Sequence, residues 1–167
     1  MRCPQCGKEM EKREGTYRYE ESGLKNVVLV NIPIYRCPSC KETEVEIPCL
    51  EELHLLLGFL LVLKPVRLNG AEVRYLRKHL GYTEEDLASF LGVTRMTIHR
   101  WEMGKTPFRP DHDKHLRRFY LDKKGGELKR LPQSNRMLSA LVDYLPLSPQ
   151  KKEIRIRPEA WAHSRAA

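Results

Sequence analysis

The sequence predicts an α+β fold, in which a small N-terminal zinc-ribbon-like β domain is joined by a helix to an all-α helix-turn-helix domain. Three observations predict it: two Cys-Pro-x-Cys pairs with β-favouring segments between them, a leucine-rich stretch behind the second pair, and four short helical patterns separated by glycine and proline. We therefore expect a four-cysteine zinc-binding domain with its connecting helix over residues 1–64, the helix-turn-helix domain over residues 65–121, and a partly helical C-terminal extension over residues 122–167.

The four paired cysteines predict a structural metal site. The two CxxC pairs are separated by 30 residues, and each presents two thiolates through a tight turn. Zn²⁺ favours four sulfur or nitrogen ligands in a tetrahedron, and a closed set of four thiolates leaves no position for water or substrate. The first histidine is His54, so a mixed cysteine and histidine set from this segment is excluded. The predicted cofactor is one structural zinc ion, held by Cys3, Cys6, Cys37 and Cys40.

The alternative for these cysteines is two independent thiol pairs. A redox-active CxxC lies at a strand-to-helix junction in a βαβ unit, and neither pair has that setting. Short strands are expected instead, at Thr16–Glu20 and Val27–Tyr35, and the spacing leaves room for about three strands between the pairs. A segment this small buries little core, so metal binding is expected to supply much of its folding free energy, on the order of 10 kcal/mol. Cys49 has no partner, and we expect a small buried side chain there.

The leucine-rich stretch Cys49–Leu63 predicts a connecting helix that ends at Lys64-Pro65. Its apolar run is about half of the roughly 20 residues that cross a bilayer, so we expect a buried or partner-facing helix and no membrane association. Residues 66–69 form a short linker, Lys123-Lys124-Gly125-Gly126 a loop, and Ser134–Leu145 an amphipathic helix. The four short helices between linker and loop are expected at Ala71–Leu80, Thr83–Leu91, Thr94–Met103 and Asp111–Leu121.

The second and third of these helices have the local signals of a helix-turn-helix. Thr83 is a good N-cap with Asp86 at the capping-box position, and acidic residues complement the positive helix start. Ala88 is small where a second helix crosses closely. Gly92 can take the left-handed conformation that the turn needs.

The helix behind the turn has two faces. Thr94, Ile98 and Trp101 share one face at 100° per residue, and this face is expected to pack on the preceding helix at Leu87 and Leu91. Met96 and Arg100 point the opposite way, flanked by Arg95 and His99, so the exposed face is cationic and suits the major groove of duplex DNA. The loop behind it offers side chains for phosphates and is rigidified by two prolines. The expected DNA-binding residues are Thr94, Arg95, Met96, Thr97, His99, Arg100, Lys105, Thr106 and Arg109.

Charge supports double-stranded DNA as the partner. The chain carries a net charge of +8, and the excess is confined to residues 65–167, which hold 21 Lys and Arg against 12 Asp and Glu. A basic segment suits a polyanion because neutralised phosphates release counterions. A solvated basic surface that only aids solubility is the alternative. The chain runs from Met1 directly into the first cysteine pair, so we expect no signal peptide and a cytoplasmic location.

The order of these motifs resembles the MqsA/YgiT family. The resemblance covers about residues 1–121 and rests on the two Cys-Pro-x-Cys pairs, the leucine-rich connector, and Arg77-Lys78, Leu87-Ala88, Leu91-Gly92-Val93 and Arg100-Trp101-Glu102 followed by Gly104. It implies a zinc domain followed by a five-helix DNA-binding domain of the Xre type. It also implies an antitoxin that binds a ribonuclease toxin with the zinc domain and represses its own operon as a dimer. In that family pattern the four paired cysteines are the metal ligands, Arg100 reads bases, and Met96 occupies the other reading position.

The expected function is that of a sequence-specific transcriptional regulator, a repressor that binds a two-fold DNA site as a homodimer. Expected dimer contacts are Leu116 and Phe119, or the group Met137, Leu138, Leu141 and Leu145. A neighbouring toxin gene would make it an antitoxin, and an isolated gene a free-standing zinc-containing regulator. An RNA-binding zinc ribbon that stacks bases on Tyr17, Tyr19 and Tyr35 is the further alternative. Enzymatic activity, either thiol exchange or zinc-dependent hydrolysis, is not expected, because the zinc shell is closed and no general base lies beside it.

Overall fold

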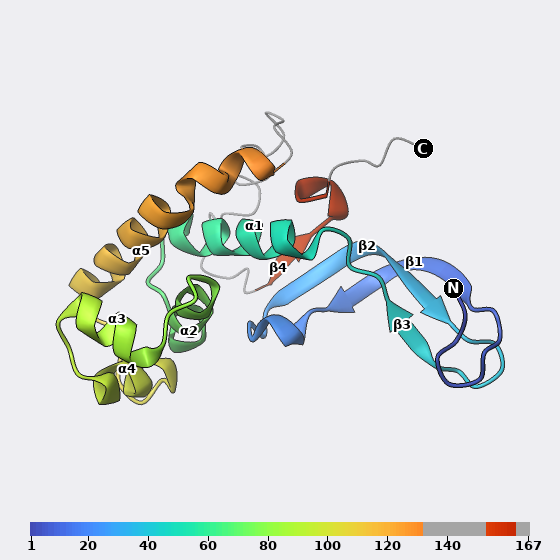
Figure 1. Ribbon diagram of the computed structural model, residues 1–167, viewed down its shortest axis with the longest axis horizontal. Coiled ribbons are helices and arrows are strands. Elements are labelled where there is room, and N and C mark those ends of the chain that lie inside the picture. Colours follow the sequence, from blue (N-terminus) through green and yellow to red (C-terminus); the bar gives the residue numbers. More distant parts are fainter. Residues whose placement is uncertain (132–152, 163–167) are drawn as a thin grey trace.

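The computed structural model describes residues 1–131 and 153–162, and within them a sheet region precedes a helical region (Figure 1). This order confirms the predicted α+β fold. The strands are β1 (Glu11–Arg18), β2 (Val27–Arg36), β3 (Thr43–Val45) and β4 (Ile154–Ile156). The α-helices are α1 (Leu50–Leu63), α2 (Gly70–His79), α3 (Glu84–Leu91), α4 (Arg95–Glu102) and α5 (Pro110–Lys124). Three 3-10 helices complete the described elements: η1 (Glu20–Ser22), η2 (Gly125–Arg130) and η3 (Pro158–Ala160).

Strand β2 is the centre of the sheet. It pairs antiparallel with β1 along one edge, with a register shift between Gly15 and Thr16. Its other edge is shared, because β3 pairs antiparallel with its C-terminal end and β4 pairs parallel with its N-terminal end. Two strands therefore lie between the cysteine pairs and not about three, since β3 follows the second pair. The first strand also begins earlier than the predicted Thr16–Glu20.

Helix α1 is apolar on all sides because it is buried on all sides. It lies between the sheet and helices α2 and α5 (Figure 1), and nine of its residues are buried. Gly58 is required there, because a Cβ at this position would lie 1.8 Å from the Tyr120 hydroxyl of α5. Within residues 1–131 and 153–162, no helix is both long and apolar enough to cross a membrane. The prediction of a buried Cys49 is wrong: the thiol is exposed, because this residue precedes α1 in a left-handed conformation (φ 48°) outside the core.

The C-terminal segment returns to the N-terminal sheet. Strand β4 adds to the β2 edge, and Trp161 is fully buried, with its indole nitrogen donating to the carbonyl oxygen of Pro48 over 2.7 Å. Nothing in the sequence pattern predicted this return. The predicted loop at Lys123–Gly126 is also wrong, because α5 continues to Lys124 and η2 follows it directly. The predicted helix Ser134–Leu145 lies outside the described residues.

The linker between α1 and α2 is held firmly by α5. The Arg117 guanidinium donates to the carbonyl oxygens of Val62 (2.9 Å), Lys64 (2.7 Å) and Val66 (2.7 Å), and its Nε pairs with Asp113 at 2.8 Å. Buried side chains of the sheet, of α1 and of the helical region form one continuous cluster. A domain boundary near residue 64 therefore remains a prediction. Buried side chains from before and after residue 64 pack together in this cluster.

Candidate nucleic-acid interface and cysteine cluster

The predicted capping and turn of the helix-turn-helix are present in α3. Thr83 Oγ1 accepts from the backbone nitrogen of Asp86 over 3.1 Å, and the Asp86 carboxylate accepts from the Thr83 nitrogen over 2.8 Å, which completes the capping box. The Thr83 hydroxyl also donates to the Asp86 carboxylate over 2.7 Å, and this bond, followed by that from the Thr83 nitrogen, lowers the pKa of the Asp86 carboxyl. Gly92 ends α3 with φ 66°, the left-handed conformation that allows the chain to turn into α4.

Helix α4 packs through the face that the sequence predicted, with one exception. Ile98 and Trp101 are buried, as are Leu87 and Leu91 of α3. Thr94 is exposed, because it is the N-cap of α4 and not part of the packed face. Its hydroxyl accepts from the Thr97 nitrogen over 3.3 Å and lies 2.9 Å from the Thr97 hydroxyl, so it serves the helix start.

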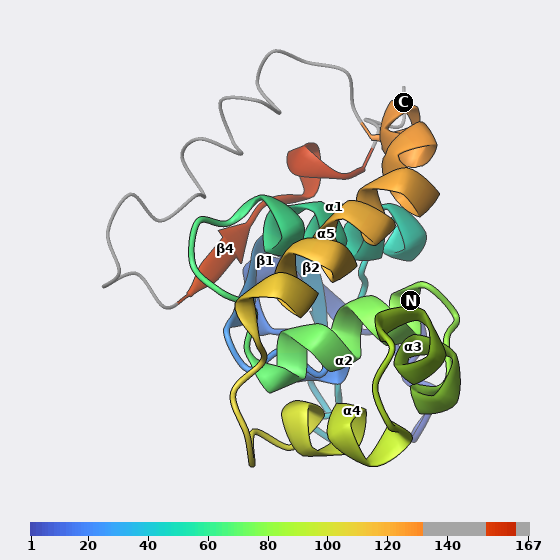
Figure 2. The same cartoon turned by 90° about the vertical axis from the view of Figure 1, so that its left-hand side faces the viewer.

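The opposite face of α4 is open to solvent. Met96 is 56% exposed and Arg100 is exposed, and in the described residues the Arg100 side chain has no hydrogen bond or ion pair. Figure 2 shows α4 at the bottom of the view, well separated from β4, so strand β4 leaves this face uncovered. Arg100 therefore keeps its five donors and its full reach for a partner outside the chain.

The two side chains that flank Arg100 are held by acidic residues of the first helix of the motif. The Glu84 carboxylate lies 3.2 Å from both Arg95 Nε and His99 Nδ1, and Glu85 also lies 3.2 Å from Arg95 Nε. His99 and then Arg95 lower the pKa of the Glu84 carboxyl, so it is ionised at neutral pH. The reading face is therefore less cationic than the sequence suggested, and Glu84 fixes the directions of Arg95 and His99.

A buried ion pair that the sequence analysis missed holds α4 against α2. The Glu102 carboxylate accepts two hydrogen bonds from Arg77, at 2.5 and 2.8 Å, and one from Arg74 at 3.1 Å. Its side chain is fully buried, so removal of either partner would leave an uncompensated charge. The helices also approach closely: a Cβ on Gly70 would lie 2.2 Å from the Trp101 carbonyl oxygen.

The loop behind α4 presents the predicted phosphate contacts. Lys105, Thr106 and Arg109 are all exposed. The anchor of this loop is Phe108, which the sequence analysis did not single out and which is buried against the Trp101 ring at a centroid distance of 5.0 Å. The three polar side chains are thus carried on a loop attached to the core beneath the reading helix.

The four paired cysteines converge at the far end of the sheet. All four sulfur atoms lie within 4.8 Å of one another, and the closest pairs are Cys3 with Cys40 (3.4 Å) and Cys6 with Cys37 (3.5 Å). Tetrahedral zinc, with sulfur at about 2.3 Å, needs sulfur separations of roughly 3.8 Å, so small side-chain adjustments would bring the set to that geometry. These residues can hold one metal ion.

The two cysteine turns have the same construction. In the first turn the Cys3 nitrogen donates to the carbonyl oxygen of Lys8, and the Cys3 carbonyl oxygen accepts from the Gly7 nitrogen. The second turn has the same two bonds, from Cys37 to Glu42 and from Lys41 to Cys37. The residue four positions after the first cysteine has a left-handed backbone conformation in both turns: Gly7 with φ 72° and Lys41 with φ 66°. Two like turns facing each other place one buried and one exposed thiol on each side of the cluster.

Two further sets of predicted contacts look different in the structure. Leu116 is fully buried and therefore unsuited to a dimer contact, while Phe119 is partly exposed and stacks on Phe90 at 4.0 Å. The other predicted dimer contacts, Met137, Leu138, Leu141 and Leu145, lie outside the described residues. The tyrosines proposed as RNA-stacking surfaces are engaged within the fold: Tyr19 is buried, Tyr17 donates to Glu21, and Tyr35 donates to Glu46 over 2.7 Å.

Comparison with known families supports the central motif. A helix-turn-helix family of the Xre type matches residues 73–112, which run from the first turn of α2 to the first turn of α5. No curated protein and no solved structure matches the chain. Residues 73–112 are therefore similar to a helix-turn-helix family, which supports a DNA-binding regulator.

Proposed function

We propose that this protein is a sequence-specific transcriptional regulator, a repressor that binds double-stranded DNA by inserting α4 into the major groove. The observation that carries the proposal is the exposed pair Met96 and Arg100 on the helix whose other face is buried. A bidentate arginine on guanine contributes roughly 1–3 kcal/mol of discrimination between bases. Methionine offers an apolar contact, which suits the methyl group of thymine.

The remaining predicted contacts divide by role. Thr97 and the Glu84-oriented pair Arg95 and His99 border the base-reading side chains. Lys105, Thr106 and Arg109 are assigned to phosphates, which fix the position of the protein without reading sequence. Thr94 supports the start of the helix and contacts DNA only where its backbone approaches a phosphate.

The metal at the cysteine cluster is proposed to be one structural zinc ion. Four thiolates from two rigid turns match the ligand type and number that Zn²⁺ prefers, and they leave no open coordination position. Such a closed shell stabilises the fold and gives no place for a substrate, so we propose no catalytic role for it.

A homodimer is proposed because α4 has eight residues and reads only a few base pairs, so a specific site needs two copies. The antitoxin role that the family resemblance implies extends this proposal. In that role the zinc-binding end would hold a toxin protein, and a small basic reading frame beside this gene would support it. An isolated gene would leave a free-standing regulator.

A gel shift on the DNA upstream of the protein's own gene tests the proposal. Wild type is compared with Arg100→Ala on that DNA and on a random duplex of equal length. We expect the variant to lose about 5- to 150-fold of the preference for the upstream site, which corresponds to 1–3 kcal/mol, and to keep weak, salt-sensitive binding.

Arg13→Ala is the matched control. Arg13 is an exposed arginine of β1 at the other end of the molecule (Figure 1), so it removes the same charge without touching α4. The control is expected to bind like wild type. Equal losses for Arg100→Ala on specific and random DNA, or equal losses in both variants, would contradict base reading by α4.

A further inference from the structure

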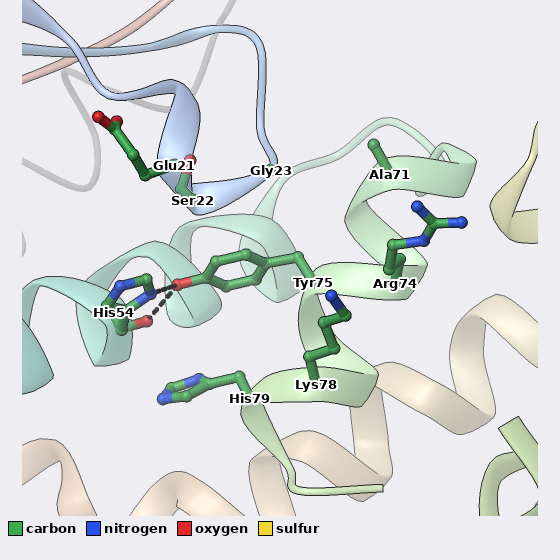
Figure 3. Close-up of a pocket in the computed structure, with 9 residues that line it drawn as sticks. All are labelled: Glu21, Ser22, Gly23, His54, Ala71, Arg74, Tyr75, Lys78 and His79. Carbon is green, nitrogen blue, oxygen red and sulfur yellow. Dashed lines mark hydrogen bonds between the residues drawn. The ribbon is translucent and has the colours of Figure 1, made fainter. Parts of the chain in front are cut away.

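A pocket lies where the sheet region meets the helix-turn-helix. Its volume is about 370 Å³, and Figure 3 shows its lining: three residues of η1 and the turn behind it, His54 of α1, and five residues of α2. This volume is within the range of small-molecule sites, which occur preferentially between domains. A molecule bound here would touch both regions at once.

Three polar groups of the lining are already hydrogen-bonded within the fold. His54 is bonded through Nε2 to the Tyr19 hydroxyl and through Nδ1 to the Tyr75 hydroxyl, each at 2.9 Å. The Glu21 carboxylate accepts from Tyr17 and points away from the centre of the pocket in Figure 3. The Ser22 hydroxyl donates to the carbonyl oxygen of Tyr19 over 2.7 Å.

The unused polar groups include an uncommitted cation. Lys78 is exposed and its ammonium group has no hydrogen bond or ion pair in residues 1–131 and 153–162. Figure 3 shows it rising from α2 on the same side of the pocket as Arg74, whose Nε is held by Glu102. His79 is bonded to the Tyr120 hydroxyl through Nδ1 at 2.8 Å, which leaves its other ring nitrogen for a ligand. Burial, and then the positive charge of Lys124, lower the pKa of His79 to about 4, so the imidazole is neutral at physiological pH and offers a hydrogen bond without a charge.

We propose that this pocket binds a small organic anion, whose carboxylate or phosphate group pairs with Lys78 while its apolar body lies against Tyr75 and Ala71. The lining carries two cations, Lys78 and Arg74, against one carboxylate, Glu21, which points away from the centre of the pocket, and the ring and methyl surfaces cover the body of the ligand. The ligand bridges η1 to α2, so it stiffens the joint between the sheet and the helix-turn-helix. It is an effector site in position, separate from α4 and from the cysteine cluster.

The test is a nuclear magnetic resonance titration of the full-length, zinc-loaded, DNA-free protein with benzoate. We expect saturable shifts of the backbone amides of Gly23, Tyr75 and Lys78. Benzamide has the same shape without the charge, and we expect it to bind at least about ten-fold more weakly, as for the loss of one favourable charge interaction. Phenyl phosphate is the third probe, and the tighter of the two anions identifies the head group.

Two variants and a control decide the assignment. Lys78→Gln is expected to reduce benzoate affinity to that of benzamide, and Ala71→Phe to abolish both by filling the pocket. Lys129→Gln removes an exposed lysine of η2 outside the lining and is expected to bind like wild type. Equal binding of benzoate and benzamide, no saturable shift with either anion, or an equal loss in Lys129→Gln would overturn the proposal. The readout needs no DNA, so its failure is distinct from failure of the proposed regulator function.

Discussion

The cysteine end and the centre of the molecule are stabilised by different means. At the cysteine end the buried cluster consists of Cys3, Met10 and Cys37, with Tyr35 packed against it. The centre has one large continuous cluster that includes the sheet, α1 and the helix-turn-helix. Three buried side chains remove too little apolar surface from water to fix two turns. The comparison supports the proposed zinc ion, which would replace the core where the chain is too short to build one.

Strand β2 crosses the boundary between these two regions. Its first six residues contribute Val27, Leu29 and Ile32, all fully buried in the central cluster. Its C-terminal end leads to Cys37 and pairs with β3. Loss of the metal is therefore expected to unfold the two cysteine turns and to stop at β2 and β3, where Ile34 and Val45 pack against the central cluster.

The largest expected effect comes from breaking the metal site. Cys37→Ser removes a buried ligand, and the loss of structural zinc is worth on the order of 10 kcal/mol to the segment that it folds. We expect zinc content to fall to near zero and the amide resonances of residues 1–10 and 37–42 to collapse, while those of α2 to α5 keep their dispersion. Zinc analysis and heteronuclear correlation spectra measure both.

Cys49→Ser is the control for that experiment. It removes the one exposed cysteine outside the cluster of four, so zinc content and spectra are expected to match wild type. A Cys37→Ser protein that keeps one equivalent of zinc, or one whose helices unfold together with the turns, would contradict the division into a metal-held end and a core-held centre.

The next largest expected effect concerns the central core, where Trp161 anchors β4. Trp161→Ala removes a fully buried side chain that carries β4 on the sheet and leaves the Pro48 carbonyl without its donor. We expect a loss of about 3–5 kcal/mol in the free energy of unfolding, measured by urea denaturation. Zinc content is expected to stay at one equivalent, because the cysteine cluster lies at the opposite end of β2 from β4.

Trp161→Phe separates packing from hydrogen bonding at the same position. It keeps most of the buried ring and loses the donor, so we expect a smaller loss, about 1–2 kcal/mol. Equal losses in the two variants would mean that the hydrogen bond to Pro48, and not burial, holds β4 on the sheet.

The features that the sequence predicted are those with local signals. The capping box of Thr83 and Asp86, the left-handed Gly92 and the two cysteine turns each depend on residues within a few positions of one another. The parallel pairing of β4 with β2 joins residues more than a hundred positions apart, and Trp161 meets Pro48 across 113 positions. Single-sequence periodicity has no information on such pairings, so this part of the fold could not be foreseen.

At the candidate DNA surface, too, the sequence predicted the local features and missed a contact between two helices. The helical period correctly separated buried Ile98 and Trp101 from exposed Arg100. It could not show that Glu84 lies beside Arg95 and His99, because that contact depends on the angle between two helices. An acidic residue at the first position of α3 was visible in the sequence, but it was interpreted only as a partner of the helix dipole.

The smallest expected effect is the pH dependence of folding stability that His79 contributes in the centre of the molecule. Burial, and then the charges of Lys124 and His54, lower the pKa of His79 to about 4, from 6.5 in the unfolded chain. As the pH falls through 6.5, His79 becomes protonated in the unfolded chain, whereas in the folded chain it stays neutral until about pH 4. Stability from this group is therefore complete above pH 6.5 and is lost progressively toward pH 4.

Because His79 is only partly buried, the expected loss is about 1–2 kcal/mol, less than the full pKa difference would give. Acid also protonates the cysteine thiolates and releases zinc, so the pH profile of wild type alone mixes the two regions. The difference in unfolding free energy between wild type and His79→Gln, measured by urea denaturation from pH 7 to pH 4.5, cancels the metal contribution, since both proteins share the cysteine cluster. If that difference stays constant over this range, His79 does not contribute to the acid sensitivity of the centre.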